Sequence, residues 1–224
     1  MEAALFVVFA IAAVVVAYLI SQAAREKRRQ GWMALGTHLG LTYSPGDDRI
    51  ETLPFDLLQR GDGRGIDHVL SGEHDGVDVR IFEFWYYVTT YNGKTTTRTY
   101  HRFTCALAQV GLDAPHITID REGFLSRVAD HMGFRDIEFE SEEFNRAMNI
   151  RCGDRRFASY LIDARMMEYL LPLDGWSFEV YGNRTLASCG RLAPADVDQA
   201  LAAVLSFREK IPRAATDSYG RDSR

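Results

Sequence analysis

Residues 77–110 read VDVRIFEFWYYVTTYNGKTTTRTYHRFTCALAQV and carry the strongest strand pattern of the chain. Both halves are rich in β-branched and aromatic residues, which favour strands. Between them lies Asn92-Gly93, a dipeptide typical of tight hairpin turns. If these two residues form the whole loop, the register makes one pair of opposite charges and two pairs of aromatic rings: Glu83 with Arg102, Phe82 with Phe103 and Trp85 with Tyr100. The stretch therefore predicts a long antiparallel hairpin.

The sequence after the hairpin alternates between strand and helix patterns. Strands are expected at 116–120, 136–141 and 144–152, with a second hairpin at 176–189 around Gly182-Asn183. Helices are expected at 123–131, from the N-cap Asp154 to Pro172, and from Pro194 to Pro212. Residues 213–224 are poor in apolar side chains and are expected to be a disordered tail. The pattern indicates an α+β fold, in which a mainly antiparallel sheet carries two or three packed helices.

The sequence before the hairpin begins with an uncharged run, which is followed by a basic segment and then by a segment rich in glycine and turn residues. Residues 1–24 are expected to be a transmembrane anchor, and 25–40 a basic segment that continues into a short helix from Trp32. Residues 44–66 are rich in glycine and turn residues, and they predict loops around one short helix at 55–60. The α+β domain is therefore expected to span 41–212.

The anchor is predicted from residues 3–20, AALFVVFAIAAVVVAYLI, which contain no charge and no helix breaker. As a helix they span about 27 Å, and the uncharged run to Ala24 spans about 33 Å. A bilayer core is about 30 Å thick. The competing interpretation is a cleaved signal peptide, which requires a basic start that this chain lacks. We therefore expect an uncleaved single-pass helix and a membrane partner.

The basic residues Arg25, Lys27, Arg28 and Arg29 follow this run directly, and no basic residue precedes it. Basic flanks remain on the cytoplasmic side of a membrane. The expected location is the cell inner membrane, with the N-terminus outside and the domain in the cytoplasm. The same four residues can act as a topology signal only, or can also contact anionic lipid.

Charge and cysteine content exclude several classes of protein. The net charge is -5, and residues 31–212 alone carry -8, which argues against binding of nucleic acid. A body of that charge is also weakly repelled by an anionic membrane. Three widely spaced cysteines exclude a disulfide scaffold and fit a reducing compartment.

The aromatic hairpin is the candidate interaction surface for a protein partner that the sequence does not identify. Aromatic strands can stack on ligands, although they also pack sheets. The residues selected for this surface are Trp85, Tyr91, Tyr100, Glu83 and Arg102. His101 is interpreted as a packing residue of the same hairpin.

No catalytic, cofactor-binding or metal-binding motif is recognised in the sequence. The acidic residues from Asp136 to Glu143 alternate as on a solvated strand face and lack a calcium-loop spacing. The six histidines have no metal-ligand spacing. No catalytic, cofactor or metal residue is therefore assigned, and no cofactor is predicted.

A family resemblance rests on Phe139-Glu140-Ser141-Glu142-Glu143-Phe144-Asn145-Arg146, on Asp154, and on a helix that ends in Arg165-Met166-Met167-Glu168. Leu70-Ser71-Gly72 and the strand from Val79 to Phe84 add to it. In this order the chain resembles a bacterial domain-of-unknown-function family of single-pass, membrane-anchored proteins. The resemblance implies location and architecture, and no catalytic residue.

Three functions remain open from the sequence. The first is a membrane-tethered interaction or scaffold module without enzymatic activity. The second is a ligand-binding or enzymatic domain whose site forms only in the fold, for which a cleft holding His101, Glu83 and Arg102 would be the evidence. The third is a pleckstrin-like lipid-binding module, suggested by an antiparallel sheet closed by a C-terminal helix.

Overall fold

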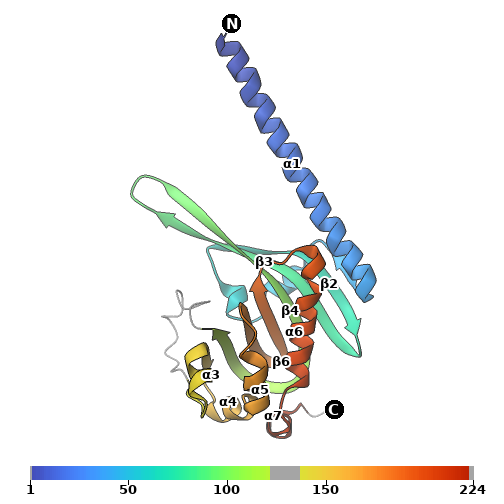
Figure 1. Cartoon of the computed structure of the whole chain (residues 1–224), viewed down its shortest axis with the longest axis vertical. Helices are drawn as coiled ribbons and strands as arrows, with labels where there is room; N and C mark the ends of the chain where they lie inside the picture. Colours follow the sequence, from blue (N-terminus) through green and yellow to red (C-terminus); the bar gives the residue numbers. More distant parts are fainter. Residues whose placement is uncertain (1, 122–136, 222–224) are drawn as a thin grey trace.

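The computed structural model describes residues 2–121 and 137–221 and has an α+β fold, as predicted. Figure 1 shows a long helix that leaves a body of sheet and short helices. The elements are α1 (Glu2–Leu39), β1 (Thr42–Ser44), α2 (Asp48–Glu51), the 3-10 helix η1 (Leu57–Gln59), β2 (Gly63–His74), β3 (Val77–Tyr91), β4 (Thr96–Arg121), α3 (Glu142–Ala147), β5 (Met148–Cys152), α4 (Arg155–Leu161), α5 (Ala164–Leu170), β6 (Trp176–Gly190), the 3-10 helix η3 (Pro194–Asp196), α6 (Asp198–Glu209) and α7 (Arg213–Tyr219).

The sheet is antiparallel and centres on β4, a strand of 26 residues. The order β1-β2-β3-β4-β5 describes the main path, and β6 pairs with β4 as well. β3 pairs with residues 96–108 of β4 and β5 with residues 117–121, while β6 pairs along 103–119. β3 and β5 therefore share one edge of β4, and β6 occupies the other.

The β3–β4 hairpin confirms the predicted pairing of these segments but not its register. β3 ends at Tyr91 and β4 begins at Thr96, so the loop has four residues and not two. The Asn92 side chain favours this loop, because its Oδ1 accepts two backbone N–H groups of the loop, at 3.1 and 2.9 Å. The predicted pairs are replaced by Glu83–Thr104, Phe82–Cys105 and Trp85–Arg102. A shift of two residues keeps every side chain on its predicted face.

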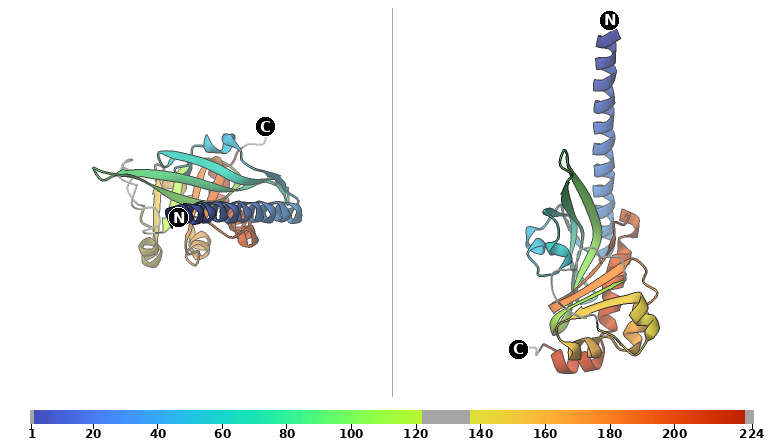
Figure 2. Two further views of the ribbon diagram at one scale, coloured as in Figure 1. Left: turned by 90° about the horizontal axis from the view of Figure 1, so that it is seen from above. Right: turned by 90° about the vertical axis from the view of Figure 1, so that its left-hand side faces the viewer.

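The two faces of the sheet carry different layers. One face packs against α4, α5 and α6 in the larger core, where Phe178 and Phe207 stack with ring centroids 4.8 Å apart. The opposite face is covered by the segment that holds α2 and η1, through Ile50, Phe55 and Leu58. Figure 2 shows these layers on the two sides of the sheet. The apolar surface that both faces bury is the main stabilising contribution to the domain.

α1 is one unbroken helix of 38 residues with two different environments. Its segment from Phe9 is long and apolar enough to cross a membrane, with a mean hydropathy of 1.4, and its most apolar stretch is unburied. Its last turns belong to the domain, because Trp32 is fully buried and Gly31 lies against Pro194 of η3. The predicted short helix from Trp32 is thus the end of α1 itself.

The helix predicted from Asp154 to Pro172 consists of two helices. Asp154 caps α4 as predicted, since its Oδ1 accepts two backbone N–H groups at 2.9 and 3.0 Å. Asp163 caps α5 in the same way, through the N–H of Met166 at 2.9 Å. An aspartate that bonds its own backbone favours a helix start over a helix interior. The cap at Asp163 therefore begins α5, and α4 ends before it at Leu161.

The strand pair predicted at 136–141 and 144–152 is mostly wrong. Residues 137–141 form no strand, α3 occupies 142–147, and only β5 pairs with β4. Ser141 caps α3 by accepting the Phe144 N–H at 3.2 Å. The acidic residues that follow the cap lie in the first helical turn, where the helix dipole favours them. The predicted helix at 123–131 lies outside the described residues.

The second predicted hairpin, at 176–189, is a single bent strand. β6 continues through Gly182, whose φ is +55°, and pairs with β4 on both sides of an irregularity. The irregularity falls between Gln109 and Ile117 on β4. Gly182 therefore bends the strand instead of reversing it.

The disordered tail predicted at 213–224 is wrong for residues 213–219, which form α7. Ala215 is buried, and the Tyr219 hydroxyl donates to Asp154 Oδ2 at 2.8 Å. The rings of Phe157 and Tyr219 also meet edge to face. A few long-range contacts thus order a segment of low apolar content. The closing helix is confirmed: Pro194 opens η3 and α6 follows it.

Candidate functional site

A groove of about 830 Å³ lies between the charged turns of α1 and the nearby strands. Its size falls within the roughly 300–1,000 Å³ of small-ligand sites. The residues that line it come from α1, from the β1 and β2 region, from β4, and from the segment after β6: Gln22, Ala24, Arg25, Glu26, Arg28, Arg29, Tyr43, Pro45, Asp67, His68, Arg102 and Arg191. We call it the arginine groove.

Three of these arginines meet at Glu83, which is fully buried in β3. Arg28 Nε and Arg191 Nε each lie 2.7 Å from its carboxylate, and Arg102 Nη1 lies at 3.2 Å. Arg28 also donates to the backbone carbonyl of Leu192 at 2.9 Å. A buried carboxylate requires such partners, because desolvation of an unpaired charge is costly. Glu83 therefore joins α1, β4 and the segment after β6 at one point.

The groove keeps an excess of positive charge. Its five arginines face three carboxylates, those of Glu26, Asp67 and the buried Glu83. Glu26 is bound by Arg29 at 2.8 Å, and Asp67 lies 3.5 Å from Arg102 Nη1. Arg25 donates a hydrogen bond to the Ser21 hydroxyl at 3.4 Å and has no ion pair among the described residues. The groove is thus suited to an anion with several oxygen atoms.

His68 forms part of one wall through a bulge in β2. The register of β2 shifts between Asp67 and Leu70, and His68 has a φ of +51°, which is uncommon outside glycine. The bulge lets its ring stack on Trp32 at 5.7 Å and lets Nδ1 bond the Tyr43 hydroxyl at 3.0 Å. Burial lowers the pKa of His68, although the nearby carboxylates oppose this. The lowered pKa favours the neutral form of the His68 ring.

The predicted interaction surface divides into three parts. Glu83 does not belong to a surface, because its carboxylate is buried beneath the arginines, and Arg102 lines the groove. Trp85 is half-buried and packs near Tyr100, with ring centroids 6.1 Å apart. Tyr91 and Tyr100 are 68% and 53% exposed on the projecting hairpin. The tip is therefore open, as a surface for a partner requires.

The cleft of His101, Glu83 and Arg102 that would have favoured an enzymatic or ligand-binding domain does not form. His101 pairs with Tyr86 in the sheet and stacks on its ring at 4.8 Å. Tyr86 belongs to the core on the opposite face from the groove. Glu83 and Arg102 do meet, as diagonal neighbours in the observed register.

The four basic residues of the predicted topology signal have different roles. Arg28 is tied to Glu83 and to the domain, and Arg29 is paired with Glu26 on α1 itself. Arg25 lines the groove and is exposed, and Lys27 is exposed. At least one residue of the signal is therefore also a structural contact between α1 and the sheet.

A second polar cluster comprises Asp56, His116 and Glu179, whose potential ligand atoms lie within 4.8 Å of one another. Burial opposes the charge of His116, but Glu179 and Asp56 outweigh this and raise its pKa. The Glu179 carboxylate already accepts the backbone N–H groups of Asp56 and Leu57, at 2.6 and 3.0 Å. These bonds hold the start of η1 against β6. We therefore interpret the cluster as structural.

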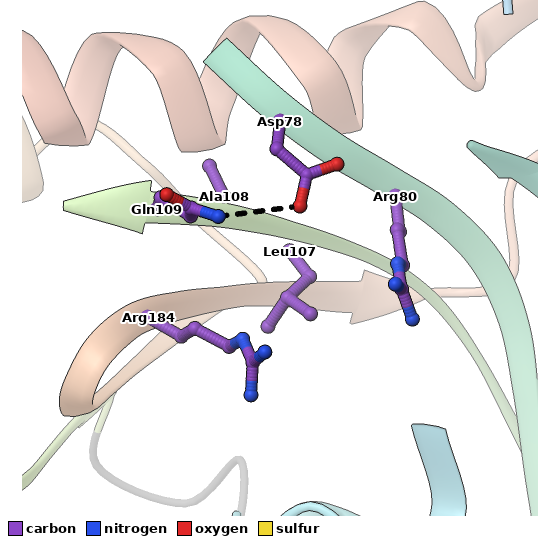
Figure 3. Close-up of a pocket in the computed structure, with 6 residues that line it drawn as sticks. All are labelled: Asp78, Arg80, Leu107, Ala108, Gln109 and Arg184. Carbon is purple, nitrogen blue, oxygen red and sulfur yellow. Dashed lines mark hydrogen bonds between the residues drawn. The ribbon is translucent and has the colours of Figure 1, made fainter. Parts of the chain in front are cut away.

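A small hollow on the outer surface of β3, β4 and β6 is shown in Figure 3. Gln109 Nε2 donates to Asp78 Oδ2 at 3.4 Å across it, and Arg80 and Arg184 border it. Its volume of about 10 Å³ has room for at most about one water molecule. It is too small for a ligand.

Comparison with known proteins gives one structural likeness. No family model matches the chain, and no curated protein matches it. The predicted family resemblance therefore stays a prediction. The fold is similar to the crystal structure of the mycobacterial trehalose monomycolate transport factor A, TtfA, with a TM-score of 0.55 and 14% identity. The match covers 82% of this chain and 92% of that chain, and at this identity it shows a shared fold alone.

Most residues of the groove were missed in the sequence, among them Arg191, Tyr43 and His68. Arg191 follows a strand end, Tyr43 belongs to a strand of three residues, and His68 is placed by a bulge. Each contributes through contacts with residues far away in the chain. No local pattern in the sequence marks these positions or indicates which arginines meet at Glu83.

Proposed function

We propose that this chain is a membrane-tethered accessory factor, an interaction module without enzymatic activity that serves a transport process at a membrane. α1 crosses the inner membrane once with its N-terminus outside, and the α+β domain lies in the cytoplasm. The observation that carries the proposal is the continuity of α1, which runs from an exposed apolar segment into the core without a linker.

The contacts at the base of α1 support a rigid tether. Trp32 is buried among sheet and helix residues, and Gly31 allows close approach to Pro194. Arg28 adds a charged contact with Glu83. A domain fixed to its span in this way has a set height and orientation above the membrane, which suits a factor that meets membrane-embedded partners.

The β3–β4 hairpin is the proposed contact surface for a protein partner. It projects from the body on the side from which the apolar part of α1 leaves (Figures 1 and 2). From residue 84 to residue 112 the chain contains no acidic side chain, although the domain as a whole is acidic. Exposed tyrosines at the tip add the amphipathic rings that are common in interfaces. The likeness to TtfA, a transport factor by name, supports the same general role.

Cysteine labelling tests the tether and its orientation. The three native cysteines are buried, and burial raises the pKa of the Cys105, Cys152 and Cys189 thiols, so the folded chain should react slowly. A Thr95→Cys variant adds one exposed thiol at the hairpin loop. We expect a membrane-impermeant maleimide to label this variant in inside-out vesicles and not in intact cells. Labelling of intact cells, or release of the chain by alkaline carbonate, would contradict the proposal.

Photo-crosslinking tests the contact surface. A photoreactive residue at Thr97, on the hairpin, should crosslink a discrete membrane protein in cells. The same residue at Arg165, exposed on α5, is the matched control. Identical crosslinked products from both positions would count against the hairpin.

A further inference from the structure

We propose that the arginine groove binds the phosphate group of an anionic phospholipid. The inference rests on the proposed function, because it places the groove at the inner surface of the membrane that α1 crosses. It assigns to the groove a ligand class and to Arg25, Arg102 and Arg191 the role of binding residues.

The position of the groove favours a lipid headgroup over other anions. The uncharged run of α1 ends at Ala24, and the groove is lined by Gln22, Ala24 and Arg25. The groove therefore begins at the last uncharged turn of the helix and continues along the first charged turns. In a membrane crossed by this helix, that is the depth of the phosphate groups.

The charge of the groove differs from that of the domain because α1 contributes to it. Residues 31–212 carry a net charge of -8, yet the groove has two more arginines than carboxylates once Arg25, Arg28 and Arg29 of α1 are included. The acidic body is repelled by an anionic leaflet, so the lipid contact must be confined to this site. On a protein with a basic surface, attraction to anionic lipid would be spread over that surface and would not be confined to a groove.

The arrangement of the arginines leaves donors free for a ligand. Glu83 orients Arg102 and Arg191 from below, and these two side chains remain 37% and 41% exposed. Arg25 enters from α1 without a carboxylate partner among the described residues. Guanidinium groups that are held in place and partly exposed can bind phosphate oxygens in pairs with little further loss of entropy.

The neutral wall completes a site for a diester with an attached headgroup. Tyr43 and His68 line the groove with two rings joined by a hydrogen bond, and the volume of the groove is large enough for a glycerol group. A free phosphate ion has the same oxygen chemistry but would leave most of the about 830 Å³ unfilled. Competition between a phospholipid and inorganic phosphate separates a lipid headgroup from a free phosphate ion.

The test uses the full chain in neutral detergent micelles and native mass spectrometry. The probes are short-chain phosphatidylglycerol, short-chain phosphatidylcholine and inorganic phosphate, offered together and one at a time. We expect phosphatidylglycerol to be retained in preference to the other two. Each groove arginine near the headgroup is worth about 1 kcal/mol, so Arg25→Gln should weaken retention about fivefold and Arg25→Gln/Arg191→Gln about 25-fold.

Arg165→Gln is the matched control, because it removes the same charge from the exposed surface of α5. Arg25 is exposed, and its hydrogen bond is to Ser21 on the same helix, so Arg25→Gln should leave the fold of the domain intact. Equal retention of phosphatidylglycerol by the groove variants and the control overturns the proposal. Preferential binding of inorganic phosphate, or equal binding of phosphatidylcholine, overturns the lipid assignment. Micelles have no sidedness, so failure here is distinct from failure of the tether.

Discussion

Glu83 is the residue that determines how α1 meets the sheet. Its carboxylate is buried and lies within 3.2 Å of arginines from three separate parts of the chain. Removing one member of a buried ion cluster leaves its partners desolvated without compensation.

We therefore expect Glu83→Gln to destabilise the full chain. The arginines keep some exposure to water, so the expected loss is about 2 kcal/mol, which corresponds to a decrease of roughly 4–8 °C in melting temperature. Thermal unfolding in neutral micelles is the measurement. Glu73→Gln, on an exposed position of β2, is the control. If both variants unfold at the same temperature, Glu83 does not hold the junction.

Asp120 makes stability depend on pH. Burial raises the pKa of this carboxyl to about 6, although Arg151 at 3.1 Å opposes the effect. Between pH 4 and pH 6 the folded state then binds more protons than the unfolded state. Stability attributable to this group is therefore present at acidic pH and is lost as the pH rises through about 6. One pH unit corresponds to about 1.4 kcal/mol, so the cost at pH 7 is on the order of 2–3 kcal/mol.

Asp120→Asn should consequently stabilise the protein at pH 7.5 and should have little effect at pH 4. Melting temperatures of both chains at the two pH values test this. Asp113→Asn, at an exposed position of the same strand, should change neither value. A variant that is less stable than the native chain at pH 7.5 would show that the Arg151 pair outweighs burial.

The packing of α1 against η3 depends on Gly31, a glycine in the interior of the helix. A Cβ at Gly31 would lie 2.6 Å from the Cβ of Pro194, closer than real contacts allow. Alanine normally stabilises a helix by about 1 kcal/mol relative to glycine. At position 31, helix propensity therefore favours alanine, whereas the contact with Pro194 disfavours it.

We expect packing to dominate, so that Gly31→Ala lowers the melting temperature and loosens the junction. Hydrogen exchange of the amides around Trp32 should become faster, while exchange in α6 should change less. Gln30→Ala, one position earlier on an exposed face, should leave both measurements unchanged. A stabilised Gly31→Ala chain would mean that η3 moves away at no cost.

The elements show what local sequence can and cannot predict. The hairpin, the cap at Asp154 and the closing helix follow from turn residues, caps and periodicity, which are local. The predicted register of the hairpin was wrong because Asn92 is compatible with a loop of two residues and with the observed loop of four. The groove is different in kind: Arg191 and Arg28 meet Glu83 through the path of the whole chain. No local pattern encodes that meeting.

The junction between α1 and the sheet sets where the hairpin lies relative to the apolar part of α1. The β3–β4 hairpin projects from the side of the body from which the apolar part of α1 leaves, and α5 lies toward the opposite end of the body (Figure 1). In a bilayer crossed by α1, the hairpin loop should be close to the headgroups and α5 far from them. Exposed tyrosines and basic residues, with no acidic residue near the tip, suit that position.

A spin label at Thr95→Cys, in nanodiscs that carry a paramagnetic metal on the lipid headgroups, should therefore relax faster than one at Arg165→Cys. Inserting Gly-Ser-Gly-Ser between Ala24 and Arg25 keeps the domain intact but breaks the helix between span and body. The insertion should reduce the difference between the two labels, because the body can then tumble relative to the membrane. Equal relaxation of the two labels before the insertion would contradict the fixed orientation. A difference that survives the insertion would mean that the hairpin binds the membrane by itself.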